Sequence, residues 1–185
     1  MEYRTLSTIA TISSGGTPRK DRSEYWEGDI PWISAKTLHG EEAFESTLHI
    51  SEEGLSAGSR MARPGDILVL TRGSGLFNAI PIAWVTAPVA FNQDVKCLSV
   101  PNETDARYLF YWLLASRKAI SNHLETTGIG AGKIDTQFLL SMEVGWPNKK
   151  TREKLVSFFD VISYKIRINS RINDHLLEMT IYSSS

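Results

Sequence analysis

The sequence predicts a mixed α/β (α+β) domain over residues 1–150, followed by a long coiled-coil-forming helix over residues 151–185. Two patterns support this fold class. Short apolar runs bounded by turn residues fill residues 64–100, as in a sheet, whereas residues 150–182 contain neither proline nor glycine, as in one long helix. With 185 residues, 42% of them apolar, the chain suits one domain and an appended element.

Residues 1–60 are rich in turn signals, and the segment SSGGTPRKDRSEYWEGDIPWISAKTL, residues 13–38, concentrates them. Gly15 and Gly16 permit positive φ angles, and Pro18 restricts the backbone that follows. A turn at residues 28–29 is expected to lead into a short strand over residues 31–34. Aromatic residues beside turns usually anchor loops, and we expect this role of Tyr25, Trp26 and Trp32.

The region from residue 64 to 100 is predicted to form β-strands. The run PGDILVL is a turn followed by continuous apolar residues, as in a buried strand. AIPIAWV and DVKCLSV are expected to form two more strands, joined through TAPVAFNQ. Pro81 predicts that the strand containing AIPIAWV is an edge or irregular strand, because proline cannot donate to a ladder of hydrogen bonds.

Apolar residues recur at helical spacing after residue 104 and predict a helix over residues 105–125. Thr104 is the expected N-cap, with Asp105 in the first turn. The glycine-rich segment TTGIGAGKID is predicted to be a loop, and TQFLLSMEVGWPN a short turn with a strand that ends at Pro147.

The C-terminal helix carries a seam of residues at heptad-like spacing. Four of them lie seven apart, and four others fill the intervening positions; together they are Leu155, Phe159, Ile162, Ile166, Asn169, Ile172, Leu176 and Met179. A polar residue on such a seam, here Asn169, can set the register of a coiled coil. The alternative is an amphipathic helix that packs on its own domain, which the apolar residues on other faces of its first turns also favour.

Composition excludes several classes of protein. The chain has no apolar run long enough for a bilayer, and its N-terminus lacks the pattern of a signal peptide. The single cysteine, Cys97, excludes an internal disulfide framework, so we expect a cytoplasmic protein with a buried thiol. A formal charge of −1 argues against a generic nucleic-acid coat, but Arg19, Lys20 and Arg22 form a local basic cluster that suits a DNA contact or a solvated loop.

Searches for a catalytic or cofactor site leave one weak enzyme hypothesis. The glycines near Lys133 have neither P-loop nor dinucleotide-binding spacing, and the motifs of a methyltransferase are missing. The four histidines, His39, His49, His123 and His175, are scattered without the spacing of metal ligands. Asp66, Asp94 and Lys96 resemble the loose layout of a Mg²⁺-dependent nuclease, a pattern that is common by chance.

Several segments, in order, resemble the DNA specificity subunits of type I restriction–modification systems, specifically one half of such a subunit. The segment over residues 13–38 is similar to the opening of a target-recognition domain. PGDILVLTRG and AFNQDVKCLSV, with the pair Asn92-Gln93, resemble its central strands, and DARYLFYWLLAS resembles the following helix. The segment from GWPNKKTREK to NDHLLEM is similar to the conserved spacer helix, although the acidic residue and glutamine frequent before that helix are replaced by NKKTREK.

The resemblance implies a non-catalytic subunit without a cofactor. Such a subunit binds double-stranded DNA and docks methyltransferase subunits, and a restriction subunit adds cleavage. Residues 1–150 would then be the DNA target-recognition domain and residues 151–185 the spacer and dimerisation helix. The candidate DNA contacts, on loops and strand ends, are Ser13, Ser14, Gly15, Gly16, Thr17, Arg19, Lys20, Arg22, Lys36, Arg72, Gln93, Gly130 and Lys133.

A complete family member usually carries two recognition domains and two spacer helices, whereas this sequence has one of each. It is therefore expected to be a natural half-subunit, which forms a homodimer or pairs with a second half, or else a fragment. Two alternatives remain open at this point: the stand-alone nuclease, and an oligomerisation module that does not bind DNA.

Overall fold

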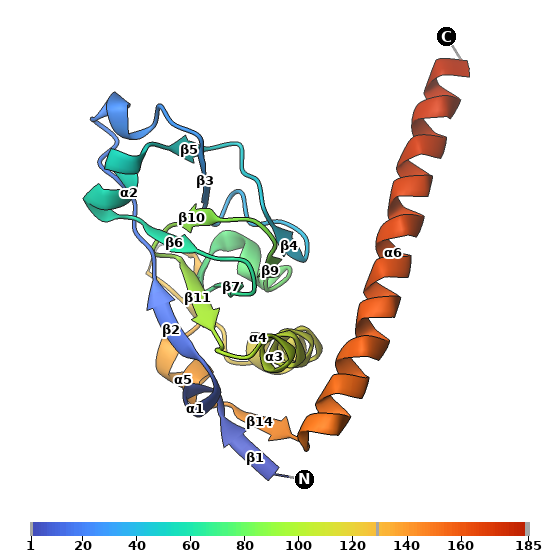
Figure 1. Ribbon diagram of the computed structural model, residues 1–185. Coiled ribbons are helices and arrows are strands. Elements are labelled where there is room, and N and C mark those ends of the chain that lie inside the picture. The colour runs from blue at the N-terminus through green and yellow to red at the C-terminus, as the bar shows by residue number, and fades with distance from the viewer. Residues whose placement is uncertain (1, 129, 184–185) are drawn as a thin grey trace. The chain divides into compact units, whose positions relative to one another are not determined.

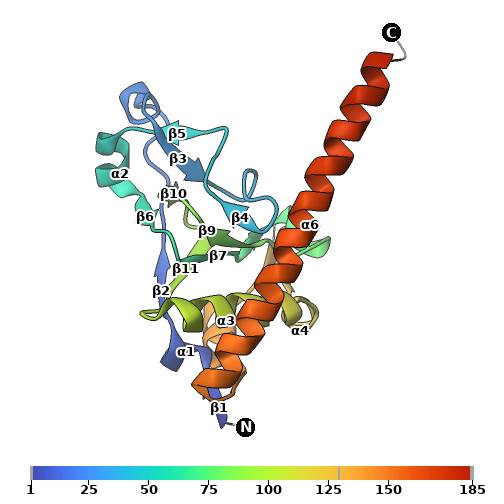
Figure 2. The same cartoon turned by 45° about the vertical axis from the view of Figure 1, so that its right-hand side comes forward.

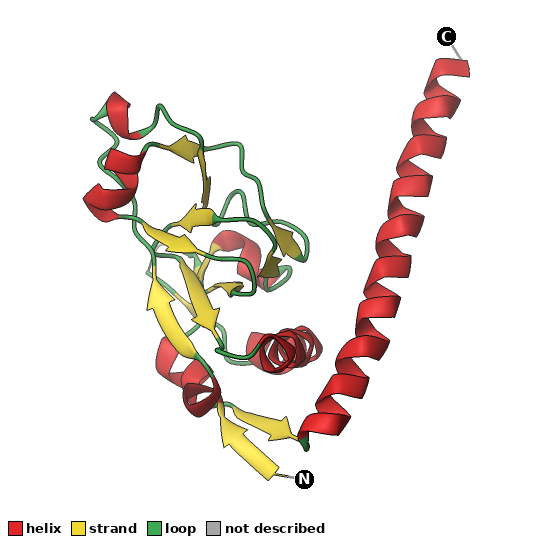
Figure 3. Ribbon diagram, in the orientation of Figure 1, coloured by secondary structure: helices red, strands yellow, loops and turns green. Residues whose placement is uncertain are grey.

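A computed structural model of the protein describes residues 2–128 and 130–183 (Figure 1). The chain divides into two compact units, Met1–Pro147 and Asn148–Ser185. The first unit mixes short strands and helices, and the second consists of one long helix, which confirms the predicted fold class. Figure 3 shows how much of the path between the strands of the first unit is loop.

The elements of the first unit are short. Its strands are β1 (Glu2–Thr5), β2 (Thr11–Ser14), β3 (Ile30–Ile33), β4 (Glu42–Ala43), β5 (His49–Ile50), β6 (Arg60–Ala62), β7 (Ile67–Leu70), β8 (Arg72–Gly73), β9 (Ile82–Val85), β10 (Val89–Phe91), β11 (Val95–Ser99), β12 (Glu125–Thr126), β13 (Gly132–Lys133) and β14 (Glu143–Trp146). Its helices are α1 (Leu6–Ile9), η1 (Ser23–Tyr25), α2 (Glu52–Gly58), η2 (Ser74–Phe77), α3 (Glu103–Ala115), α4 (Arg117–Ser121) and α5 (Thr136–Ser141). In Figures 1 and 2, α1 and α5 lie beside each other at the start of β2.

A five-stranded sheet in the order β2-β11-β7-β9-β4 forms the centre of the first unit. The strands β2, β11, β7 and β9 are antiparallel, and β4 joins β9 in parallel. All four side chains of β7 are at most 1% exposed. Burial of both faces explains why this strand reads as the continuous apolar run ILVL, and it confirms the strand expected after Pro64-Gly65.

A four-stranded sheet in the order β5-β3-β10-β6 lies next to the loops of the first 60 residues. The strand β3 pairs in parallel with β10, and Trp32, Ile50 and Ala90 form a buried cluster there. Two smaller sheets complete the unit, one formed by β1 and β14, the other by β12, β13 and β8. The β1–β14 pair joins the first residues of the chain to the strand that precedes Pro147.

The predicted helix over residues 105–125 is in fact two helices, α3 and α4, separated at Ser116. The N-cap is Asn102 rather than Thr104, and its side-chain oxygen accepts a hydrogen bond from the backbone N–H of Asp105 at 3.1 Å. After the break, Arg117 donates to the backbone oxygen of Ile80 and forms an ion pair with Glu41. These distant contacts could not be read from helical spacing.

Pro81 does not mark an edge strand, because β9 lies between β7 and β4. The proline precedes the strand, and its carbonyl oxygen accepts a hydrogen bond from the backbone N–H of Leu70 at 3.0 Å. A proline before the first paired residue does not remove a donor from the ladder. The strand β10 was also missed, because it occupies the segment expected to connect two strands.

The second unit is α6 (Lys149–Ser183), which closely matches the predicted helix. Its first turn is capped by Asn148, whose side-chain oxygen accepts from the backbone N–H of Thr151 at 3.0 Å. The seam residues from Phe159 to Met179 are exposed on this chain, including Ile166 at 60% and Leu176 at 55%. Within the described residues, no helix is long and apolar enough to cross a membrane.

Gly15 and Gly16 do not adopt the positive φ angles that we expected. They are required for a different reason, which is the close approach of other backbone segments. A Cβ atom at Gly15 would lie 2.0 Å from the carbonyl oxygen of Phe91, and one at Gly16 would lie 1.8 Å from that of Gly58. The paired glycines therefore let the end of β2 contact β10 and the end of α2.

This contact predicts that Gly16→Ala lowers the free energy of unfolding by about 1–3 kcal/mol, because the backbone must move to admit the methyl group. Urea denaturation followed by tryptophan fluorescence measures the change. The matched control is Gly75→Ala in η2, where an added Cβ meets nothing within 4 Å. We expect this control to stay within about 0.5 kcal/mol of the parent protein. Equal stability of the two variants would contradict the packing role of Gly16.

Candidate nucleic-acid interface

Residues 17–22, here called the basic loop, are held in place by two tryptophan side chains. The indole N–H of Trp32 donates to the carbonyl oxygen of Gly16 at 3.3 Å, and that of Trp26 donates to the carbonyl oxygen of Arg19 at 3.2 Å. The two rings pack edge to face, with centroids 5.1 Å apart and planes at 83°. The indoles therefore hold the backbone directly before the loop, at Gly16, and within it, at Arg19. This is the anchoring role that the sequence predicted for aromatic residues beside turns.

The three cations of the basic loop differ in how strongly neighbouring carboxylates compete with a phosphate for them. Arg19 forms two hydrogen bonds of 2.6 and 3.0 Å to Asp21, and they lower the pKa of that carboxyl. Arg22 lies 3.3 Å from Glu24 in a second local ion pair. Lys20 is exposed and forms no ion pair within the described residues. Lys20 is consequently the cation of this cluster with the least competition for a phosphate.

Four polar side chains from distant segments form a connected row beside the basic loop. The ammonium of Lys96 donates to the hydroxyl of Ser14 at 2.8 Å and to the carbonyl oxygen of Gln93 at 3.1 Å. The hydroxyl of Thr17 donates to the side-chain oxygen of Gln93 at 2.7 Å. We call Ser14, Lys96, Gln93 and Thr17 the polar row. Partial burial lowers the pKa of Lys96, and nearby Arg72 lowers it further, while Asp94 opposes the shift.

The two residues of the pair Asn92-Gln93 differ in role: Asn92 is structural, and Gln93 exposes its side chain. Asn92 is 5% exposed, and its side-chain oxygen accepts from the backbone N–H groups of Asp94 and Val95 at 3.1 and 3.2 Å. Its amide nitrogen donates to the Asp94 carboxylate at 3.0 Å. Asn92 thus fixes the turn into β11. Gln93 is exposed, and the bond from Thr17 holds its amide in place.

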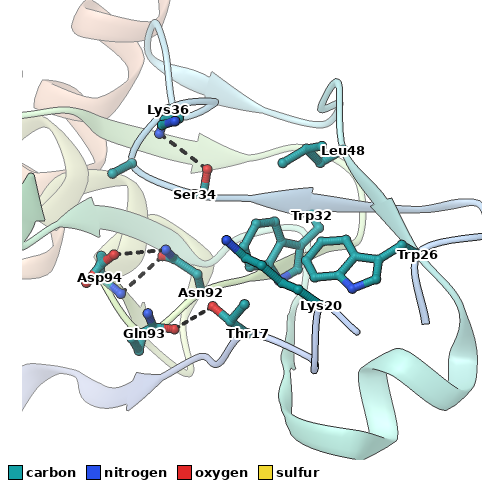
Figure 4. Close-up of a pocket in the computed structure, with 11 residues that line it drawn as sticks. Thr17, Lys20, Trp26, Trp32, Ser34, Lys36, Leu48, Asn92, Gln93 and Asp94 are labelled. Carbon is teal, nitrogen blue, oxygen red and sulfur yellow. Dashed lines mark hydrogen bonds between the residues drawn. The ribbon is translucent and has the colours of Figure 1, made fainter. Parts of the chain in front are cut away.

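A pocket of about 520 Å³ lies between the basic loop and this turn (Figure 4). Trp26, Trp32 and Leu48 lie on one side of it, and Asn92, Gln93 and Asp94 lie on the other. Lys20 comes from the basic loop and Lys36 from the loop after β3, so the pocket combines cations from two segments. Such a combination of apolar walls, amides and cations suits a planar anionic ligand.

The other residues that the sequence predicted as DNA contacts lie outside the pocket and the polar row. Arg72 and Lys133 lie opposite each other on β8 and β13, and Lys133 is 3.5 Å from Glu125. Gly130 lies in the hairpin between β12 and β13 with a φ of 78°, and its N–H donates to the Thr127 carbonyl oxygen. Ser13 pairs with Cys97 and contributes to the environment of its thiol, so it does not join the polar row. Burial raises the pKa of Cys97 to about 12, which keeps this thiol protonated.

The structure contradicts the nuclease hypothesis. Asp66 precedes β7 and Asp94 precedes β11, and these strands are antiparallel neighbours with Ile67 opposite Leu98 and Leu70 opposite Val95. The two carboxylates therefore sit at opposite ends of the strand pair, on the order of 15 Å apart, too far to share one ion. Asp66 instead accepts from the N–H of Arg63 at 2.8 Å. Within residues 2–128 and 130–183, no group of three or more potential metal ligands forms.

Sequence reasoning missed part of this candidate interface. Lys96 was considered only as a nuclease residue, although its place between the inward-facing Val95 and Cys97 in β11 indicates a side chain on the opposite face. The pocket itself carried no local signal, because its walls come from residues 17–48 and from residues 92–94.

The family model for the type I restriction modification DNA specificity domain matches residues 1–178. The match covers both the unit with the polar row and most of α6. The chain belongs to this family. Its members include the specificity subunit of the type I restriction enzyme EcoR124I/EcoR124II from Escherichia coli, which is 31% identical over 163 residues. The specificity subunit of the enzyme MjaIX from Methanocaldococcus jannaschii is 24% identical over 188 residues.

Solved structures agree on the fold of this specificity domain. A chain from a structural study of complex assembly in the type I R-M system superposes with a TM-score of 0.70 at 18% identity, over 92% of this chain and 40% of that one. The HsdS subunit from Thermoanaerobacter tengcongensis gives a TM-score of 0.67 at 16% identity, over 92% and 39%. The chain likewise covers 40% and 42% of the two curated relatives, against 86% and 96% of its own length. It therefore spans about two fifths of these relatives.

The anchoring of the basic loop predicts that Trp32→Phe speeds tryptic cleavage after Arg19, Lys20 and Arg22. Phenylalanine keeps an aromatic ring but loses the hydrogen bond to Gly16, and a contribution of about 1 kcal/mol corresponds to about fivefold more opening. Cleavage rates are measured by mass spectrometry under native conditions. The control is Trp112→Phe in α3, which should leave the rate at the basic loop unchanged. Equal rates in both variants would contradict the anchoring role.

Proposed function

We propose that this specificity domain recognises a sequence in double-stranded DNA as part of a type I restriction–modification complex. Residues 1–150 act as the target-recognition domain and residues 151–185 as the spacer helix. The domain works in the cytoplasm and is non-catalytic, because the methyltransferase subunits that it docks carry out the chemistry. Membership of the specificity-domain family supports this assignment, and the side chains around the pocket support the DNA-facing surface that we propose.

The observation that carries the proposal is the convergence of cations and hydrogen-bond donors from separate segments on one surface. The basic loop contributes Lys20, the loop after β3 contributes Lys36, and the turn before β11 contributes Gln93. Lys96 and Ser14 continue this surface along β11 and β2. Cations position a protein on the phosphate backbone, while amides and lysines read the edges of bases. With a formal charge of −1 for the whole chain, such local clustering is needed for binding.

The surface of α6 supports the proposed protein partners. Its seam, from Leu155 to Met179, suits a helix of a second copy or of a second half-subunit. Another stripe of exposed apolar residues is available for methyltransferase subunits; it comprises Phe158, Val161, Tyr164 and Ile168. A restriction subunit would join the complex through these subunits. Two apolar stripes on one helix are expected where it packs against more than one partner.

The exposed stripes of α6 also favour a second candidate function, an oligomerisation module that does not bind DNA. The two candidates differ in one measurement. Binding of the complex with methyltransferase subunits to a DNA library, followed by sequencing of the retained fragments, enriches a motif if the first proposal holds. Retention without a motif, or no retention, favours the oligomerisation module.

We expect Lys20→Ala to weaken DNA binding and to reduce the slope of log K against log salt by about one unit, because one phosphate contact is lost. Arg22→Ala should change the slope less, because Arg22 already pairs with Glu24. Fluorescence anisotropy at several salt concentrations measures both effects. Lys118→Ala on α4 removes the same charge outside the pocket and serves as the control. An unchanged slope in Lys20→Ala would show that the basic loop is only a solvated loop.

We expect Ile162→Asp and Ile172→Asp to raise the dissociation constant of self-association at least about a hundredfold, because each would bury unpaired carboxylates in the seam. Light scattering across a concentration series measures the mass, and circular dichroism checks that the first unit stays folded. Ser170→Asp introduces the same charge on another face of α6 as a control. The control is expected to stay dimeric, and a dimer that persists in both isoleucine variants would refute the seam.

A further inference from the structure

We infer that the pocket between Trp26, Trp32 and the turn at residues 92–94 accepts one unstacked nucleobase of the bound DNA. The inference rests on the proposed function, since it names what one part of the DNA-binding surface reads. A base displaced from its stack loses the contacts on both of its faces, so it binds a protein only where apolar walls and hydrogen-bonding groups replace them. Both kinds of group are present here on opposite sides of one pocket.

The apolar side of the pocket suits a planar aromatic group. Trp32 is 4% exposed and forms part of the wall, while Trp26 is half-buried and Leu48 is 41% exposed. The edge-to-face contact between the indoles fixes their orientation before any ligand arrives. The hydrogen bonds from both indole N–H groups to the basic loop add to this rigidity. A volume of about 520 Å³ lies within the range of small-ligand sites, roughly 300–1,000 Å³.

The polar side offers a donor and an acceptor whose positions are already set. Thr17 occupies the side-chain oxygen of Gln93, so the amide nitrogen of Gln93 is the end left to donate. Asp94 receives one hydrogen bond from Asn92 on one carboxylate oxygen, which leaves further acceptor capacity. Each DNA base presents an acceptor close to a donor on its pairing edge. The polar side can therefore bind the edge of a base that has lost its partner.

The two lysines of the pocket would hold the strand on either side of such a base. Lys20 and Lys36 are exposed, come from different loops, and make no ion pair within the described residues. A base that leaves the stack brings its own phosphates closer to the protein surface. Cations from two segments next to a base-sized pocket suit a nucleotide that remains part of a strand better than an uncharged ligand.

The test compares three duplexes of one sequence, each with the purified chain: a fully paired duplex, one with a single bulged nucleotide, and one with an abasic bulge at the same place. All four bases are tried in the bulge. We expect the best bulged base to bind at least about tenfold more tightly than the abasic bulge, which has the same backbone without a base. A ratio near one for every base would overturn the inference.

Gln93→Glu is the sharpest variant, because a carboxylate still accepts the hydroxyl of Thr17 but no longer donates to a base. We expect it to bring the ratio of bulged to abasic affinity close to one. This ratio cancels the general repulsion of DNA by the added charge. Gln137→Glu in α5 adds the same charge outside the pocket and should keep the ratio of the parent protein. Equal ratios in the two variants would refute the role of Gln93.

Additional measurements distinguish a site for free nucleotides, failure of the pocket alone and failure of the proposed function. Competition with free deoxynucleoside monophosphates tests the source of the base; if they bind as tightly as the bulged duplex, the pocket is a site for free nucleotides and not for DNA. A ratio near one with normal affinity for the paired duplex refutes the pocket and leaves the proposed function intact. No binding of any duplex, even with methyltransferase subunits present, would refute the proposed function itself.

Discussion

The pocket and the polar row, which we propose to face DNA, depend on one steric constraint, the contact of the backbone at Gly15 and Gly16 with β10 and α2. No side chain fits at either position, because the carbonyl oxygens of Phe91 and Gly58 occupy the space of a Cβ atom. This contact brings the end of β2 against the turn that precedes β11. The hydrogen bonds of the polar row and the position of the basic loop follow from it. A tight backbone crossing thus places side chains that are far apart in the sequence around one pocket.

Ion pairs between neighbouring residues decide which cations of this surface can bind a ligand. Two of the three cations of the basic loop are engaged by neighbouring carboxylates, while Lys20 and Lys36 stay available beside the pocket. Partial burial lowers the pKa of Lys96. Its ammonium donates hydrogen bonds to Ser14 and Gln93, so it acts both as a structural donor and as a source of positive potential. An almost neutral chain can in this way present a positive surface of limited extent.

Elements with a strong local pattern were predictable, as β7, β11 and α6 show. The short strands β4, β5, β8, β12 and β13 were not, because two residues carry no periodicity and pair with partners far along the chain. The candidate site shows the same contrast between features with a local sequence signal and features that depend on distant segments. Sequence reasoning named Lys20, Lys36, Thr17 and Gln93 as separate candidate contacts, but only the fold brings them to one pocket. It assigned Gly15 and Gly16 to the wrong backbone conformation, because a tight crossing and a turn both select glycine.

The tryptophans hold the basic loop through two backbone carbonyl oxygens, that of Gly16 directly before the loop and that of Arg19 within it. Every amino acid supplies such a carbonyl, so the identity of the side chains at residues 19–22 of the loop has little effect on this attachment. The loop can accumulate substitutions while its path over the domain stays the same. Under the proposed function, preference for a new target would evolve by exchange of a few exposed residues, without a matching loss of stability that later mutations would have to repair.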